Sequence, residues 1–240
     1  MTPDRALILA AGRGIRLKPL SDTMPKPLTE VNGRAILLNA LDHLEAAGVR
    51  ETCIVVGHLH QKILDACGAA RGKIEISYVL NADYARTNNA YSLWLAREQL
   101  LGGCLLLEAD IFFDYAVLDK LVGQSGSAWA ADHFTPEMNG CRLRADGSGA
   151  ITQLEIVKRA GYVPPNSYKS AGMLKIDATL ADKFAAWLDQ SVAEDRSVFF
   201  DLVLGRHLDE ADLRVCCVNG LRWAEIDDAN DLAAAEKIFR

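Results

Sequence analysis

The chain has 240 residues, half of them hydrophobic, with a formal charge of -6 at neutral pH and a pI near 5.4. This length supplies one substantial core and leaves little room for a second, so we expect a single domain. The acidic balance argues against non-specific binding to nucleic acid or to anionic membranes, which usually recruit basic surfaces. A small phosphate-bearing substrate stays compatible, because a few local cations suffice to bind it.

The cysteines and the N-terminal segment favour a cytoplasmic protein. The six cysteines form no CxxC pair, and most lie within apolar runs. We therefore interpret them as reduced thiols and not as a metal or disulfide framework. The apolar stretch near the N-terminus is too short for a membrane span and follows Asp4 and Arg5, so we expect no secretory signal and no membrane insertion.

Taken in chain order, short apolar runs alternate with segments of helical periodicity. The runs RALILAA, ETCIVVG and KIEISYVL indicate strands, and ILLNALDHLEAAG and residues 60–67 indicate helices between them. A further helix is expected to begin at Asn88 or Asn89, before the strand CLLLEAD. Such alternation is typical of parallel strands joined by helices, so we predict a doubly wound first half.

The pattern changes in the second half. Residues 127–177 consist of strand-like segments separated by turns, and Asp146-Gly147 suits a hairpin, so we predict an antiparallel region beside the parallel sheet. Helices are expected around residues 180–189 and 198–208. A strand pair, DLRVCCV and RWAEID, then leads into a last helix that Asp228 is placed to cap.

The segment after the first strand, LAAGRGIRLKPLSDTMPKPL, carries the first functional signal. Small residues let the backbone approach a ligand closely, and amide groups in such a loop can hold phosphates. The expected ligand contacts here are Leu9, Ala10, Ala11, Gly12 and Gly14. The glycine pair alone is weak evidence, because the third glycine of the dinucleotide fingerprint and the Lys-Ser/Thr of a P-loop are absent.

Two cations follow these glycines. Arg16 comes shortly after them, and Lys26 stands between two prolines that stiffen the chain around it. The segment resembles the opening motif of the sugar-nucleotide pyrophosphorylase superfamily, GxGxRLxPLTxxxPKPL, with Ser21 in place of the threonine. The resemblance implies that Arg16 and Lys26 grip a nucleoside triphosphate and offset charge as pyrophosphate leaves. It also implies a three-layer, Rossmann-like mixed α/β sheet, the nucleotide-diphospho-sugar transferase (GT-A-like) fold.

Acidic residues end two of the predicted strands, in the order that the family shows. In the family the matching aspartates hold the catalytic magnesium, so the resemblance implies Asp110 and Asp227 as ligands of Mg²⁺. Glu108 and Glu225 alternate with them along the strands, and they either tune the site or are surface residues at strand ends. Asp228 is the other candidate for the second ligand, but a helix cap is the simpler interpretation.

The segment from Asn81 to Leu93 separates branches of the family. It lacks the glycine-rich stretch of the sugar-phosphate members and reads N-x-x-Y-x-x-x-N-N-x-x-S-L. This pattern is similar to cytidylyltransferases that act on phosphocholine, 2-aminoethylphosphonate and related small substrates. The similarity implies a nucleotide pocket that contains Asn81, Asn88 or Asn89, and Ser92. An asparagine amide both donates and accepts, which suits cytosine without excluding uracil.

The acceptor side is predicted from residue types. An ammonium-bearing acceptor calls for aromatic faces and a carboxylate. The candidates are Trp129, Tyr168 and Trp223 with Glu155, or alternatively Asp132, as the counter-charge. Core packing is the competing interpretation for each aromatic residue. Lys158 follows the strand ITQLEIV, where many family members place a lysine on the acceptor phosphate.

We therefore expect a Mg²⁺-dependent cytidylyltransferase that transfers CMP from CTP to a small phospho- or phosphono-amine. The acceptor oxygen is already anionic, so no histidine is assigned as a general base. The alternatives are a sugar-1-phosphate or inositol-phosphate nucleotidyltransferase, a metal-dependent glycosyltransferase and a non-catalytic nucleotide sensor. We expect residues 1–126 to bind the nucleotide and residues 127–240 to bind the acceptor and complete the metal site. We also expect a cytoplasmic monomer or homodimer.

Overall fold

A ten-stranded mixed sheet forms the centre of the computed structural model, which describes residues 3–159 and 161–240. Its strands are β1 (Arg5–Ala10), β4 (Glu51–Val56), β5 (Ala70–Arg71), β6 (Ile74–Leu80), β7 (Cys104–Glu108), β9 (Ser127–His133), β10 (Gly140–Ala145), β11 (Ile151–Val157), β12 (Ser167–Ile176) and β13 (Leu213–Cys217). Two small sheets pair β2 (Glu30–Val31) with β3 (Arg34–Ala35) and β8 (Ile111–Phe113) with β14 (Trp223–Glu225).

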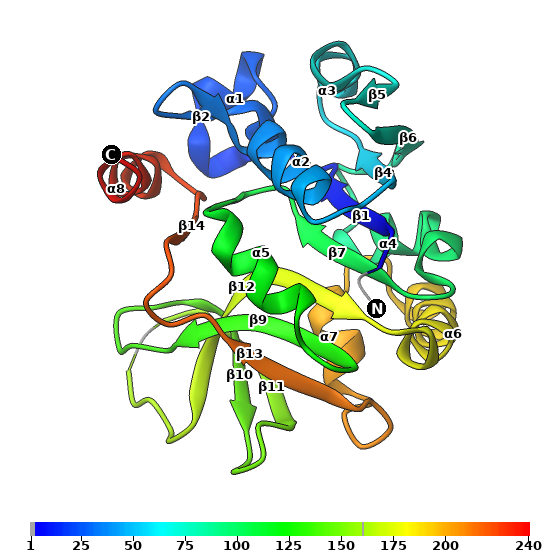
Figure 1. Ribbon diagram of the computed structural model, residues 1–240, viewed down its shortest axis with the longest axis vertical. Coiled ribbons are helices and arrows are strands. Elements are labelled where there is room, and N and C mark those ends of the chain that lie inside the picture. The colour runs from blue at the N-terminus through cyan, green and yellow to red at the C-terminus, as the bar shows by residue number, and fades with distance from the viewer. Residues whose placement is uncertain (1–2, 160) are drawn as a thin grey trace.

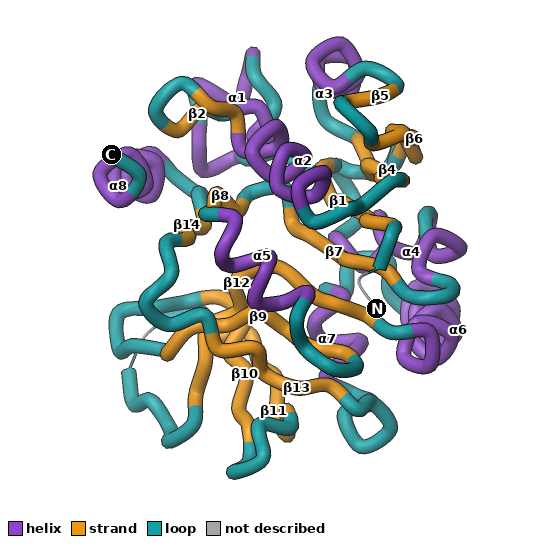
Figure 2. The backbone as a smooth tube through the Cα atoms, in the orientation of Figure 1, coloured by secondary structure: helices purple, strands orange, loops and turns teal. Residues whose placement is uncertain are grey.

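Helices connect these strands. The α-helices are α1 (Leu20–Thr23), α2 (Ile36–Ala46), α3 (His60–Cys67), α4 (Asn89–Leu95), α5 (Tyr115–Val122), α6 (Ala178–Glu194), α7 (Phe200–Gly205) and α8 (Ala229–Ile238). The 3-10 turns are η1 (Ile15–Leu17), η2 (Lys26–Leu28) and η3 (Arg97–Leu100). Figure 2 shows the strands concentrated in a band between helices, with the hairpin of β10 and β11 extending from the sheet.

The parallel part follows the sequence prediction. β1 pairs in parallel with β4 and with β7, and β4 pairs in parallel with β6. Alternate side chains of β1 enter two different cores, because successive residues of a strand point to opposite faces. Leu7 and Leu9 join the core under α4, α6 and α7, whereas Ile8 joins the core under α2, α3 and α5. Figure 1 shows α2 and α5 in front of the sheet and α7 behind it, which gives three layers.

The antiparallel part extends the same sheet. β12 pairs antiparallel with β7, β9 and β10, and β10 pairs antiparallel with β11 through the predicted turn at Asp146. α6 is longer than the predicted helix at 180–189, and α7 is shorter than the one at 198–208.

One prediction of strand pairing is wrong. The segments DLRVCCV and RWAEID do not pair with each other: β13 runs parallel to β9, and β14 runs antiparallel to β8. β8 follows directly after the acidic end of β7. Because β14 pairs with β8, the C-terminal part of the chain returns to that end of the sheet. This return brings the two predicted metal-binding segments together.

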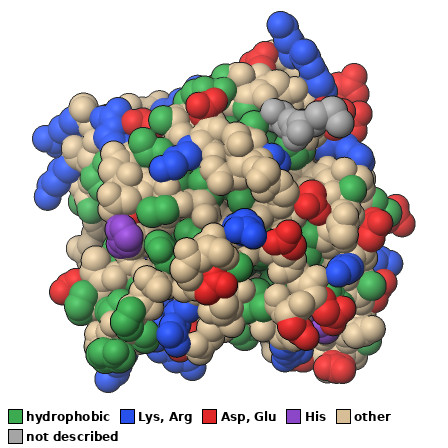
Figure 3. All heavy atoms as spheres, turned by 60° about the horizontal axis from the view of Figure 1, so that its bottom comes forward, with side chains coloured by type: hydrophobic (Ala, Val, Ile, Leu, Met, Phe, Trp, Pro, Cys, Tyr) green, Lys and Arg blue, Asp and Glu red, His purple; other side chains and the backbone are tan. Residues whose placement is uncertain are grey.

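The surface carries both signs of charge. On the face that Figure 3 shows, Lys and Arg side chains are interspersed with Asp and Glu. Among the described residues, no helix combines the length and the apolar character that crossing a membrane would require.

Candidate active site

The loop after β1 is built around a glycine that touches the predicted catalytic lysine. Gly14 has a φ of 59°, a left-handed conformation that glycine adopts without strain. A Cβ at this position would lie 2.8 Å from the Cβ of Lys26. Gly14 therefore permits both the turn into η1 and the close approach of η2. The two parts of the opening motif are packed against each other.

Lys26 bridges the two aspartates that the sequence predicts as metal ligands. Its Nζ donates to Asp110 Oδ2 at 2.8 Å and to Asp227 Oδ1 at 2.7 Å. The guanidinium of Arg16 lies 2.7 Å from Asp227 Oδ2. The structure thus brings together Arg16 and Lys26 from the N-terminal part of the chain, Asp110 from its middle and Asp227 from its C-terminal part.

The charges of this group support one another. Burial opposes the charge on Lys26, but Asp110 and Asp227 outweigh it and raise the pKa of the lysine. Burial also opposes ionisation of Asp227, yet Lys26 and Arg16 outweigh it and lower the pKa of this carboxyl. The lysine and Asp227 are therefore charged at neutral pH.

A backbone hydrogen bond fixes the spacing of the aspartates. The amide of Ile226 donates to the carbonyl oxygen of Asp110 at 2.9 Å, directly after the pairing of β14 with β8. Asp228 lies outside this group, because its side chain caps α8 in a capping box with Asp231. The interpretation of Asp228 as a helix cap is confirmed.

The acidic cluster fits a hard divalent cation. Asp110, Glu225 and Asp227 each offer a carboxylate oxygen, and these oxygens lie within 4.8 Å of one another. Asp110 Oδ1 is buried without a hydrogen-bond partner among the described residues. Mg²⁺ prefers such carboxylate oxygens and usually takes one or two of them, together with phosphate and water.

Two adjoining cavities contain the predicted nucleotide residues. The larger, of about 570 Å³, is lined by Leu9, Ala10, Gly12, Gly14, Asn88 and Asn89 together with Arg16, Lys26, Asp110 and Asp227. The smaller, of about 170 Å³, adds Ala11, Asn81 and Ser92. Tyr84 and Thr87 line both cavities and were not predicted. Their place between Asn81 and Asn88 in the sequence was the available signal.

The three asparagines of this segment make different contacts. Asn81 Nδ2 donates to the hydroxyls of Thr87 and Ser92, so this amide shapes the wall of the smaller cavity. Asn88, one of the two predicted candidates, caps α4 by accepting from the amide of Asn89. Asn89 donates to Glu108 Oε1 at 3.3 Å and accepts from the amide of Phe200 at 2.9 Å. It therefore connects the nucleotide cavities to α7.

A further cavity of about 420 Å³ lies on the other side of the acidic cluster. Its lining includes Lys158, the residue predicted to contact the acceptor phosphate, together with Lys169 and Asp201. Arg16, Asn89, Glu108, Asp110, Phe199 and Asp227 line this cavity and the larger nucleotide cavity alike. The two spaces therefore meet at the predicted metal residues, and we refer to the second as the acceptor cavity.

The prediction for Trp129 is wrong. This side chain is fully buried, and its Nε1 donates to Ser170 Oγ at 2.8 Å. Its ring stacks on Phe200 in the core under α6 and α7. Core packing, the competing interpretation, describes it correctly.

Three other acceptor candidates are also engaged outside the described lining of the acceptor cavity. Tyr168 stacks on His133, and Glu155 pairs with Arg142. Trp223 donates from Nε1 to Asp132 Oδ2 at 3.2 Å, so the alternative counter-charge is engaged as well. The residue types were plausible, but Tyr168 on β12 and Glu155 on β11 are absent from the lining of this cavity, as is Trp223 on β14.

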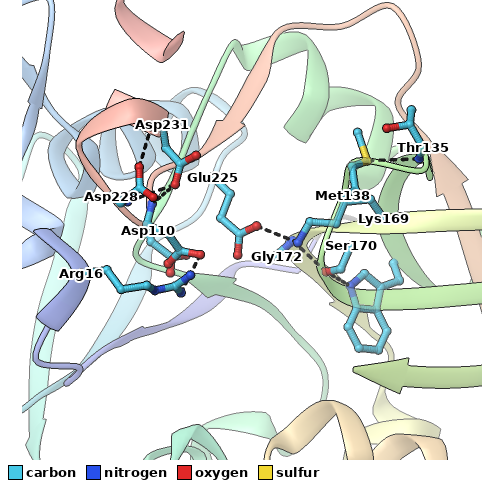
Figure 4. Close-up of polar contacts among 12 residues, drawn as sticks. Arg16, Asp110, Thr135, Met138, Lys169, Ser170, Gly172, Glu225, Asp228 and Asp231 are labelled. Atoms are coloured by element: carbon cyan, nitrogen blue, oxygen red, sulfur yellow. Dashed lines mark hydrogen bonds and ion pairs between the residues drawn. The ribbon is translucent and has the colours of Figure 1, made fainter. Parts of the chain in front are cut away.

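Lys169 is the main residue that the sequence interpretation missed. Only 7% of it is exposed, and its Nζ lies 2.6 Å from Glu225 Oε2. Burial opposes its charge, but Glu225 outweighs that effect and raises the pKa of the lysine. Figure 4 shows Glu225 between Asp110 on one side and Lys169 on the other. A lysine inside the buried run of β12 was the available signal.

The remaining acids of the acceptor cavity carry raised pKa values. Burial raises the pKa of Glu108 well above its usual value, and repulsion from Asp201 and Asp110 adds to the effect. Burial likewise raises the pKa of Asp201. Acids in such surroundings are stabilised by any cation that reaches them.

A sheet with acidic strand ends, a glycine loop and two converging cations is compatible with binding of a nucleotide. The family model described as "Nucleotidyl transferase" matches residues 5–131, more than half of the chain, and the chain belongs to this family. It is therefore a nucleotidyltransferase enzyme, and the relatives that it resembles include cytidylyltransferases.

The relatives include two enzymes of phosphonate chemistry. The chain is 37% identical to the CMP-5'-(3-aminopropyl)phosphonate synthase of Streptomyces rubellomurinus over 99% of its own length, and it spans 39% of that longer protein. It is 29% identical to the 2-aminoethylphosphonate cytidylyltransferase of Lancefieldella rimae, over 95% of this chain and 90% of the relative.

A solved structure confirms the predicted fold. The CTP:phosphocholine cytidylyltransferase of Streptococcus pneumoniae superposes with a TM-score of 0.84 and 24% identity, covering 98% of this chain and 99% of the other.

Proposed function

We propose that the protein transfers CMP from CTP to a small phosphono- or phospho-amine and releases pyrophosphate, with Mg²⁺ as cofactor. One observation carries the proposal: the nucleotide and acceptor cavities meet at Arg16, Asp110 and Asp227. Two substrates bound there would face each other across the acidic cluster. The names of the two phosphonate relatives support the choice of cytidine nucleotide and acceptor.

The residues suggest a division of labour during transfer. We assign Asp110 and Asp227, with Glu225 beside them, to hold the divalent cation, which when bound supplies charge neutralisation at the phosphates. Lys26 and Arg16 are placed to bind the triphosphate and to balance the charge of the departing pyrophosphate. Lys158 and Lys169 are the cations available to orient the anionic end of the acceptor.

The reaction needs no base from the protein. An anionic oxygen of the acceptor attacks the α-phosphorus of CTP and forms the new P–O bond. The bond from the α-phosphorus to the oxygen that bridges it to the β-phosphate breaks in the same step, and pyrophosphate leaves with that electron pair. Catalysis then rests on holding two anions in line and offsetting their charge.

The two parts of the chain support the proposed roles. Residues 1–126 supply the glycine loop, the asparagines, Lys26 and Asp110, whereas residues 127–240 supply β12, α7 and Asp227. We propose that the first part binds the nucleotide and that the second binds the acceptor and completes the metal site.

Pyrophosphate release tests this proposal. CTP, UTP and ATP are crossed with 2-aminoethylphosphonate, phosphocholine, glucose 1-phosphate and inositol 1-phosphate in the presence of Mg²⁺. Asp110→Asn is expected to lower kcat by roughly 100-fold or more, whereas Asp119→Asn, a change on the exposed face of α5, leaves it unchanged. Turnover confined to sugar or inositol phosphates would refute the acceptor class. The nucleotide that supports turnover distinguishes CTP from UTP.

A further inference from the structure

Acidic side chains outnumber basic side chains in the lining of the acceptor cavity. The carboxylates that line it are Glu108, Asp110, Asp201, Glu225 and Asp227, and the cations are Arg16, Lys158 and Lys169. Arg16 pairs with Asp227, and Lys26 pairs with both aspartates of the acidic cluster. Lys169 pairs with Glu225. Among the described residues, Glu108 and Asp201 are left without an ion pair to Lys or Arg.

Asp201 is the more deeply buried of these two acids. It lies in the first turn of α7 and is 4% exposed. Cys141 and Asn89 hydrogen-bond to its carboxyl group but are neutral, and Lys169 is already engaged with Glu225. Asp201 therefore has hydrogen-bond donors but no matched cation, and a buried carboxylate in such a place is costly unless a ligand supplies the positive charge.

The cavity offers little to a quaternary ammonium group. Such a group has no N–H to donate, and proteins recognise it with several aromatic faces. Among the described residues that line the acceptor cavity, Phe199 is the one aromatic side chain. Trp129, Tyr168 and Trp223, which could have formed a cage, are engaged elsewhere.

We propose that Asp201, with Glu108 beside it, forms a subsite for the primary ammonium group of the acceptor. The inference rests on the proposed function and names its acceptor class: an aminoalkyl phosphonate or phosphate whose nitrogen carries hydrogens. A primary ammonium group has three N–H donors for charge-assisted hydrogen bonds to these carboxyl oxygens, and a trimethylammonium group has none. The anionic end of the same molecule lies toward Lys158 and the acidic cluster. Asp201 is thus a specificity-determining residue.

The first arm of the test uses the unaltered protein with CTP and Mg²⁺. Phosphoethanolamine and phosphocholine differ only in three N-methyl groups, and 2-aminoethylphosphonate and ethylphosphonate differ only in the amine. The subsite predicts that kcat/KM favours the primary amine in each pair by about 10- to 100-fold, the range expected of hydrogen bonds between charged groups. An equal kcat/KM for the two members of either pair, or a higher value for phosphocholine than for phosphoethanolamine, would overturn the proposed subsite.

The second arm uses Asp201→Asn with Asp209→Asn as the matched control. Asp209 is exposed just beyond α7 and lies outside the acceptor cavity. The Asp201→Asn variant is expected to bring both ratios to within about threefold of unity, whereas the control keeps them. Circular dichroism checks that the variant is folded, and if it is not, the acceptor pairs of the first arm still decide the question.

The outcomes separate the two proposals. Turnover of sugar phosphates together with no turnover of any phosphono- or phospho-amine would refute the proposed function and the subsite with it. Turnover of the amines without discrimination, or discrimination that Asp201→Asn leaves intact, would refute the subsite alone.

Discussion

The nucleotide side and the acceptor side of the site are built in different ways. Most of the lining of the nucleotide cavities comes from two segments that follow parallel strands, residues 9–16 after β1 and residues 81–92 after β6. The acceptor cavity is lined by residues of β11, β12, α7 and the β14 segment. These elements are far apart in the sequence and come together only in the folded chain. The first relies on backbone shape, and the second on buried charge. We therefore expect substitutions on the two sides to affect different kinetic constants.

The largest effect is expected at the junction of the two sides. Lys26→Met removes the cation between Asp110 and Asp227, so kcat is expected to fall by roughly 100- to 1000-fold with every acceptor. The measurement is the rate of pyrophosphate release with CTP and Mg²⁺. Lys120→Met, an exposed change on α5, is the control. A loss confined to one acceptor would contradict the role of Lys26 at the shared phosphates.

A smaller and one-sided effect is expected on the acceptor side. Lys169→Met leaves Glu225 without its partner, so kcat/KM for the acceptor is expected to fall about 10- to 100-fold while the KM for CTP changes little. Lys175→Met is the matched control: this lysine is also buried on β12, but it donates to carbonyl oxygens of Val122 and Gln124. The control is expected to cost stability and to spare the acceptor KM. Equal changes in both KM values would break the division into two sides.

Trp129 tests the boundary between the acceptor cavity and the core. Trp129→Phe removes the hydrogen bond to Ser170 Oγ and leaves a small void, so the free energy of unfolding is expected to fall by about 1 to 3 kcal/mol. The KM for the acceptor stays within about twofold, because the ring lies in the core. Urea unfolding and acceptor kinetics measure the two quantities. A tenfold rise in acceptor KM without loss of stability would restore Trp129 to the cavity.

The smallest effect lies away from both sides. Burial lowers the pKa of His43, whose Nε2 contacts the carbonyl oxygen of Phe113. The unfolded chain then binds this proton more readily, so the contribution to stability is complete above the ordinary pKa and is lost as the pH falls below about 6.5. His43→Gln is expected to flatten the stability profile between about pH 7 and pH 5. The control is His60→Gln, a substitution at an exposed position, which is expected to keep the slope of unfolding free energy against pH. If His43→Gln also kept this slope, His43 would be excluded as its source.

The two sides also differ in how far the sequence predicts them. The opening motif predicted Arg16 and Lys26 as residues of one site with Asp110 and Asp227, and the structure shows the four in contact. Such a prediction was possible because the spacing within the motif is local and acidic residues at strand ends of an open sheet lie where ligands bind. The cap at Asn88 was predictable for the same local reason. Whether these residues act in catalysis stays a prediction until the variants are measured.

The acceptor side was beyond sequence interpretation for a geometric reason. The identity of a wall residue depends on which face of β12 it occupies, and a bulge between Ser170 and Met173 shifts that register. At Gly172 the φ is 64°, and a Cβ would lie 2.7 Å from the side chain of Ile111. The residue types of Tyr168 and Lys169 gave no sign that the lysine and not the tyrosine faces the cavity.

The wall that the cavities share has a consequence for turnover. Asn89, Glu108 and Asp110 line the nucleotide and acceptor cavities alike. Under the proposed function, a product formed across this wall would occupy both spaces at once and keep the contacts of the nucleoside monophosphate and of the acceptor, but not those of the departed pyrophosphate. Any change that tightens one pocket also lengthens the residence of the product, so affinity gained for either substrate slows release. The shared wall therefore sets a trade-off between selecting the acceptor and discharging what is made from it.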